Sequence, residues 1–141
     1  MPESRGNKRT EASIETDPYF FAIRAFCSRW KPFIIQGIRF DGKTRFSTFT
    51  KQLPISEKVL AVNLRELEAD GIIQRKIFPE IPPRVEYTLT ELGLSICPIL
   101  DALYKWGWHE MKRRGLPIDP LGEMWHGYRE REEASMKRPY K

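Results

Sequence analysis

The chain has 141 residues, 40% of them apolar, and a formal net charge of +5. This length suits a single domain with its own core, and the apolar fraction excludes a wholly disordered chain. No apolar run is long enough to span a membrane, and the polar first sixteen residues lack the apolar core of a signal peptide. Two cysteines are too few for a disulfide framework, so we expect a protein of the reducing cytoplasm.

The positive charge is concentrated in residues 17–58. Eight Lys or Arg residues lie there against three Asp or Glu residues, a balance of +5, whereas the rest of the chain is close to neutral. A basic segment favours an anionic partner. We expect a flexible polar tail over residues 1–16, one domain over 17–115, and a C-terminal extension over 116–141 that could pack a short helix on the body.

Three helices are predicted in the basic segment. The first begins at Asp17 and Pro18, a capping residue followed by a first-turn proline, and its apolar residues cover more than one face. The second is KPFIIQGI, which tolerates Pro32 in its first turn and has Gly37 near its end. After the turn DGKT, the third is RFSTFTKQL, with its apolar side chains spaced by three and four residues.

The next helix is read from PISEKVLAVNLRELEADG. Ser56 is a good N-cap, and Gly71 is the expected stop. Leu60, Leu64 and Leu67 recur at helical spacing, so they form one inward stripe. The opposite, polar face is therefore left for solvent or a partner.

The hydrophobic period then changes from helical to alternating. IIQRKIF and RVEYTL read as two strands of a hairpin, with Val85, Tyr87 and Leu89 on one face of the second strand. The three prolines between Pro79 and Pro83 are expected in the loop, where they cost no ladder hydrogen bond and stiffen the tip.

A long helix follows the hairpin. Thr90 is its expected cap, and Gly115 with Pro117 ends it. The order helix, helix, helix–turn–helix, hairpin, long helix is that of a winged helix-turn-helix domain. We therefore predict an α+β, mainly α fold, with dimerisation helices at both ends. The Ser56–Ala69 helix would be the recognition helix, and the hairpin would be the wing.

Three motifs carry a resemblance to a family. They are SRWKPFII with Trp30, the Ile55–Ile73 stretch with LRELEADGII, and FPEIPPRVEYTLTELG. The chain resembles the HxlR-type transcriptional regulators, relatives of MarR-like winged-helix repressors, over Asp17 to about Gly107. The resemblance implies a homodimeric prokaryotic regulator, expected to be a repressor, on an inverted-repeat operator. Many family members have a cysteine where this chain has Asp17, so their redox switch is absent here; Cys27 is a weak redox candidate.

Polar and basic residues around the recognition helix and wing are expected to contact DNA. They are Lys43, Arg45, Lys51, Ser56, Lys58, Asn63, Arg65 and Arg84. The alternative for most of them is an ordinary solvated surface. Arg45 could instead belong to a short strand paired with the wing, and Arg84 could form a salt bridge to Glu80 or Glu86. Val62 could contact a thymine methyl group, although packing is favoured.

A helix that is apolar around most of its circumference needs cover on most sides. The long helix has this character, which predicts a dimer interface shared with the first predicted helix. Its expected residues are Phe20, Phe21, Ile96, Leu100, Leu103 and Trp106. The aromatic side chains could instead line a pocket for an unknown small-molecule effector.

Other functional classes lack their signatures. Cys27, Cys97, His109 and His126 do not have zinc-ligand spacing, so we expect no metal and no cofactor. There is no phosphate-binding loop, nucleophile motif or catalytic carboxylate pair that would indicate an enzyme. The second hypothesis is a winged-helix module that binds proteins and no longer binds DNA.

Overall fold

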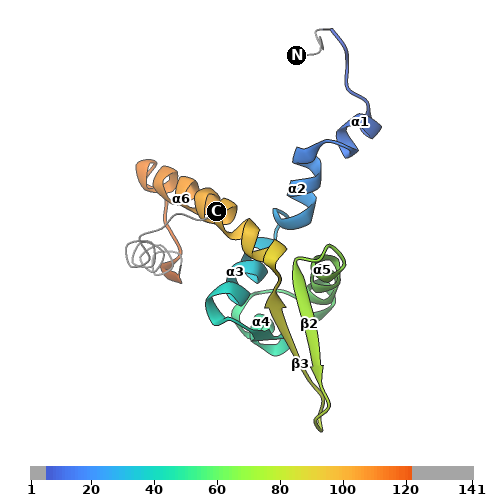
Figure 1. The fold of residues 1–141 in the computed structure, drawn as a ribbon. Coiled ribbons are helices and arrows are strands. Elements are labelled where there is room, and N and C mark those ends of the chain that lie inside the picture. Colours follow the sequence, from blue (N-terminus) through green and yellow to red (C-terminus); the bar gives the residue numbers. More distant parts are fainter. Residues whose placement is uncertain (1–5, 122–141) are drawn as a thin grey trace. The chain divides into compact units, whose positions relative to one another are not determined.

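The computed structural model describes residues 6–121, which form six helices and three strands (Figure 1). The elements occur in the order α1 (Glu11–Glu15), α2 (Pro18–Phe26), α3 (Lys31–Asp41), β1 (Thr44–Arg45), α4 (Phe46–Gln52), α5 (Glu57–Ala69), β2 (Ile73–Phe78), β3 (Arg84–Leu89) and α6 (Glu91–Arg113). The chain divides into two compact units, residues 1–93 and residues from 94 onward. The first unit contains the complete helix-turn-helix and hairpin, and the second contains most of α6.

The sheet is antiparallel, with the strand order β1-β3-β2. The short strand β1 places Thr44 opposite Tyr87 and Arg45 opposite Glu86, which is the pairing with the wing that was given as the alternative role of Arg45. In the hairpin, Phe78 is opposite Arg84. The proline-containing loop therefore lies outside the paired strands, as predicted, and every position that needs a ladder hydrogen bond has an N–H to donate.

The first unit has a core of aliphatic and aromatic side chains from α3, α4, α5 and β2. Its most deeply buried members are Ile34, Ile35, Ile38, Phe49, Leu60, Leu67, Ile72 and Ile73. The leucine stripe of α5 is buried as its spacing predicts. This core fixes which face of α5 points away from the protein.

The predicted ends of α5 are confirmed. The Ser56 hydroxyl accepts a hydrogen bond from the Val59 backbone N–H at 3.2 Å, and Gly71 takes a left-handed φ of +75° after the last turn. An N-cap of this kind contributes about 1 kcal/mol to helix stability. Helix α3 is longer than predicted, because it continues through Gly37 to Asp41 and ends at Gly42, with a φ of +79°.

The joint between the wing and α6 is tightly packed. The Thr90 hydroxyl accepts a hydrogen bond from the Gly93 N–H at 3.1 Å, as the predicted cap should, and also donates to the Ile72 carbonyl at 3.0 Å. A Cβ atom on Gly93 would lie 2.3 Å from the Ile72 carbonyl oxygen. Only glycine fits at this position without a shift of the backbone.

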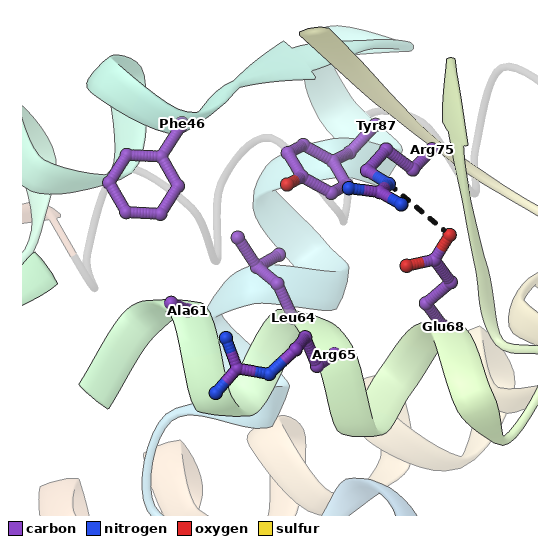
Figure 2. A pocket seen from close by; sticks show the side chains of 7 residues that line it. All are labelled: Phe46, Ala61, Leu64, Arg65, Glu68, Arg75 and Tyr87. Carbon is purple, nitrogen blue, oxygen red and sulfur yellow. Dashed lines mark ion pairs between the residues drawn. The ribbon is translucent and has the colours of Figure 1, made fainter. Parts of the chain in front are cut away.

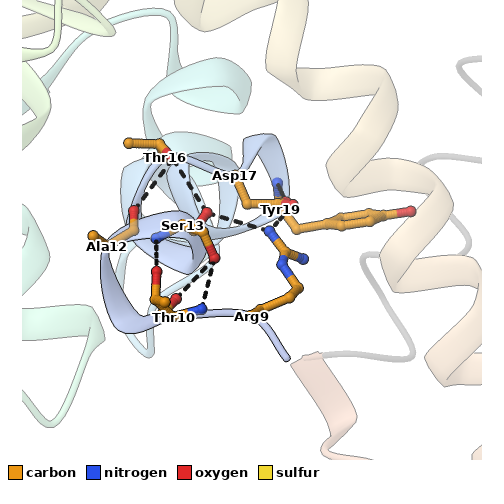
Figure 3. A network of polar contacts seen from close by, with 7 residues as sticks. All are labelled: Arg9, Thr10, Ala12, Ser13, Thr16, Asp17 and Tyr19. Carbon is orange, nitrogen blue, oxygen red and sulfur yellow. Dashed lines mark hydrogen bonds and ion pairs between the residues drawn. The ribbon is translucent and has the colours of Figure 1, made fainter. Parts of the chain in front are cut away.

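The expected polar tail contains one turn of helix, α1 (Figure 3). The Thr10 hydroxyl accepts from the Ser13 N–H, and the Ser13 hydroxyl accepts from the Thr10 N–H, so the two form a capping box. Arg9 pairs with Asp17 at 2.7 Å, and this bond together with the Tyr19 N–H lowers the pKa of Asp17. The segment has no apolar face, which is why hydrophobic periodicity did not indicate it. Most of the predicted C-terminal extension lies outside the described residues.

Candidate nucleic-acid interface

The outward face of α5 is centred on three residues, Lys58, Val62 and Arg65. Their spacing of four and three places them on one side of a helix that turns about 100° per residue, opposite the buried leucines. All three are exposed, and Val62 retains 38% of its surface. Most of the Val62 surface is therefore covered, as the packing interpretation expects, and its exposed part is available for an apolar contact with a thymine methyl group.

The cations of this face are uncommitted. Within residues 6–121, the side chains of Lys58 and Arg65 form no hydrogen bond or ion pair, and the same holds for the side chains of Arg45 and Lys51 near the two ends of α4. Long cationic side chains without protein partners can reorient toward phosphates or base edges. These four predicted contacts are thus accessible as the prediction requires.

The structure separates Ser56 and Asn63 from that group. The Ser56 hydroxyl is used as the helix cap, although the N-terminal end of α5 still presents N–H groups suited to an anion. Asn63 is half-buried on a flank of α5, about 100° from Val62, and its side-chain amide donates to the Val59 carbonyl at 2.9 Å. To read an adenine, Asn63 would first have to break this bond.

One cation of the basic segment is buried in the protein. The Lys31 side chain is 3% exposed, and its ammonium group donates to the Arg24 carbonyl at 2.9 Å and pairs with Glu66 at 3.0 Å. These contacts connect the end of α2 and the start of α3 with α5. Lys31 therefore holds the recognition helix and is not available to a nucleic acid.

The predicted wing contact, Arg84, is held by the protein. Its guanidinium lies 3.1 Å from Glu80 and 3.4 Å from Glu86, and it stacks 4.1 Å from the centre of the Phe78 ring. Both salt bridges given as alternatives are thus present, and 29% of the side chain remains exposed. Glu86 is buried, and its carboxylate lies 3.9 Å from the Lys43 ammonium group as well as beside Arg84.

A cleft of about 210 Å³ lies between α4, α5 and the two wing strands (Figure 2). It is lined by Phe46, Ala61, Leu64, Arg65, Glu68, Arg75 and Tyr87. Arg75 was missed from the sequence, where it is one of two adjacent cations in a strand. Its register partner in β3 is Tyr87, and cross-strand partners point to the same face. The alternation predicted for the second strand puts Tyr87 on one face, but only the hairpin register shows that Arg75 shares this face.

Exposed apolar side chains occur in both units. In α2 they include Phe20 and Phe21, both predicted for a dimer interface, and in α6 they include Leu103 and Trp106, of which Trp106 is 69% exposed. Ile96 and Leu100 are instead buried within the single chain. In the single chain they offer little surface to a second copy, and their predicted role in an interface stays a prediction.

The cysteines show no sign of activation. Cys27 follows α2 and is partly buried, and this burial raises the pKa of its thiol, so the reactive thiolate is disfavoured at neutral pH. Cys97 is buried. No cluster of three His, Cys, Asp or Glu suited to a metal is present in residues 6–121, and His126 lies outside them. In the same range no helix is both long and apolar enough to cross a bilayer.

An exposed helix with free cations, preceded by a short helix and flanked by a hairpin, is the DNA-reading unit of winged helix-turn-helix proteins. Comparison with known sequences assigns the family. Residues 26–114 match the HxlR-like helix-turn-helix domain, and the chain belongs to this family of transcriptional regulators. The resemblance seen in the sequence is thereby confirmed.

Individual relatives agree with this assignment. An HTH-type transcriptional regulator of Methanothermobacter thermautotrophicus is 47% identical over 87 residues, which are 61% of this chain and 66% of that relative. YtcD of Bacillus subtilis, also an HTH-type transcriptional regulator, is 43% identical over 114 residues, or 80% and 82% of the two chains. A crystal structure of ytcD has a TM-score of 0.65 at 37% identity and covers 69% of this chain and 99% of that one.

Proposed function

We propose that the protein acts as a homodimer that binds an inverted-repeat operator and represses transcription. The observation that carries this proposal is the outward face of α5, where Lys58, Val62 and Arg65 stand exposed and the two cations have no partner in the described chain. If all of these cations were paired within the protein, the helix would be interpreted as an ordinary solvated surface helix. Unpaired cations beside an exposed apolar residue instead suit contacts with base edges and phosphates.

The remaining contacts are proposed to be phosphate contacts that position this helix. Arg45 and Lys51 flank α4, Lys43 lies before β1, and Arg84 is at the base of the wing loop. Ser56 would offer the N-terminal end of α5 to a phosphate, and Asn63 would read a base only after turning from the Val59 carbonyl. In this proposal the recognition helices enter successive major grooves and the wings contact the flanking backbone.

Dimerisation is proposed because apolar surface of this kind is seldom left open in a monomer. Phe20 and Phe21 from α2, and Leu103 and Trp106 from α6, are each exposed and would be covered by a second copy. The protein-binding alternative, a winged helix without DNA binding, is not favoured by the relatives, which are named transcriptional regulators.

The test is a titration of a duplex from the upstream region of its own gene, by fluorescence anisotropy at several salt concentrations. If each protomer uses three of its cations, six phosphate contacts predict a slope of log affinity against log salt of roughly −5. Light scattering of the same sample should give the mass of a dimer. If the folded dimer binds neither this duplex nor any other duplex at low salt, the proposal is overturned.

A further inference from the structure

The cleft between α5 and the wing contains charged groups that the proposed function has not used. It is lined on one side by Arg65 and Glu68 of α5, and on the other by Arg75 of β2 and Tyr87 of β3 (Figure 2). The recognition helix and the wing therefore contribute to one cleft, and a molecule that contacts both elements must pass over it.

The geometry of B-DNA indicates which part of the duplex lies over this cleft. A major groove and the minor groove beside it are separated by a single sugar–phosphate strand. A protein that places a helix in the first groove and a hairpin on the second must straddle that strand. The surface between its helix and its hairpin then faces phosphates, and positive charge there would be used for them.

The side chains of the cleft suit a strand of phosphates. Arg65 is uncommitted, as described above. Arg75 keeps 47% of its side chain exposed, and its only ion pair within the described chain is with Glu68, at 3.5 Å. Both members of that pair are solvent-accessible, and such pairs are weak and easily exchanged. Phosphate is an acceptor that a guanidinium fork binds in two places.

Tyr87 is the cross-strand neighbour of Arg75 in the cleft. Its ring lies beside the Arg75 guanidinium, and its hydroxyl points into the cleft (Figure 2). Burial raises the pKa of this hydroxyl, so it stays protonated at neutral pH and can donate a hydrogen bond to an anion. Tyr87 is buried and lies opposite Arg75 in the sheet, so it forms the base of the cleft beside that arginine.

We infer that this cleft is a phosphate clamp: Arg65 and Arg75 bind phosphates of the strand between the two grooves, and Glu68 weakens that binding by holding Arg75. The inference rests on the proposed DNA-binding function and adds Arg75 and Glu68 to it. It assigns them opposite signs, since removal of Arg75 should weaken DNA binding and neutralisation of Glu68 should strengthen it.

The experiment measures salt-dependent affinity of the full-length protein for the upstream duplex and for a duplex of random sequence. Arg75→Gln should weaken both about tenfold and flatten the salt slope by about one per protomer. Arg75→Lys, which keeps the charge without the fork, should recover most of the slope. Glu68→Gln should bind both duplexes several-fold more tightly. Circular dichroism melting establishes that each variant is folded.

Lys76→Gln is the matched control, because it removes one charge from the same strand but from its other face. Equal losses in Arg75→Gln and Lys76→Gln would mean a general charge effect and would overturn the clamp. So would an unchanged salt slope in Arg75→Gln, or unchanged or weaker binding by Glu68→Gln. Failure of the unmodified protein to bind any duplex would overturn the proposed function itself, which separates the two results.

Discussion

The recognition helix and the wing both present cations, but the protein treats these cations differently. Lys58 and Arg65 of α5 have no partner in the described part of the chain. Arg84 of the wing is held by Glu80, Glu86 and the Phe78 ring. A free side chain can adapt to the base or phosphate that it meets, whereas a held one brings a fixed position at lower entropic cost. The number of cations on a surface therefore does not show which of them are available to bind DNA.

Lys31 extends this comparison to its limit. Lys31 belongs to the same basic segment, residues 17–58, as Lys58, yet its ammonium group is buried between α2 and α5. These cations thus form a series from free (Lys58 and Arg65) to partly held (Arg84) to buried (Lys31). Substitution of a free cation should mainly weaken DNA binding, whereas substitution of the buried cation should mainly lower the free energy of unfolding.

Arg65→Ala is expected to have the largest effect on binding. Arg65 lies on the outward face of α5 and has no structural contact to lose, so the free energy of unfolding should change by less than about 0.5 kcal/mol. Because Arg65 is inferred to bind phosphate, affinity for the upstream duplex and for a duplex of random sequence should fall alike, by about 10- to 100-fold, or roughly 1–3 kcal/mol. The measurements are anisotropy titration and urea unfolding of the same preparation. A stable variant with full affinity would remove Arg65 from the interface.

Lys31→Met should show the opposite pattern. The Arg24 carbonyl would lose its donor and Glu66 its partner, which should lower the free energy of unfolding by about 1–3 kcal/mol. Lys51→Met is the matched control: Lys51 is exposed and unpaired in the described structure, so its loss should leave stability within about 0.5 kcal/mol and weaken DNA binding. If Lys31→Met unfolds at the same urea concentration as the unmodified protein, the buried contacts do not hold α5.

Helix α5 and Lys31 show what the sequence could and could not predict. The existence, ends and buried stripe of α5 depend on neighbours in the chain, such as Ser56 and the three leucines, and all were predicted. The burial of Lys31 depends on Arg24 and Glu66, which other elements bring to it. No local pattern distinguishes this lysine from Lys58.

Dependence on other elements of the fold also explains why Asn63 and Arg75 were not placed correctly from the sequence. Asn63 has the chemistry of a base-reading residue, but the phase of α5 relative to the core places it on a flank. Arg75 could be assigned to the cleft only once the hairpin register was known, because register decides which face of the strand it occupies. The wing loop was predicted well, since the absence of an N–H in proline is a local property.

Arg84→Ala is the smallest of the expected effects and the one that sharpens the comparison most. If the held arginine contacts a phosphate, its loss should weaken binding several-fold on every sequence and flatten the salt slope by about one per protomer. Glu80→Gln provides the complementary test, because it removes the more exposed partner of Arg84 and keeps the arginine. Arg84, then held by Glu86 and the Phe78 ring alone, should bind DNA more tightly. If neither variant changes the salt slope, Arg84 is a structural residue of the wing, and the contacts to DNA come from the uncommitted cations alone.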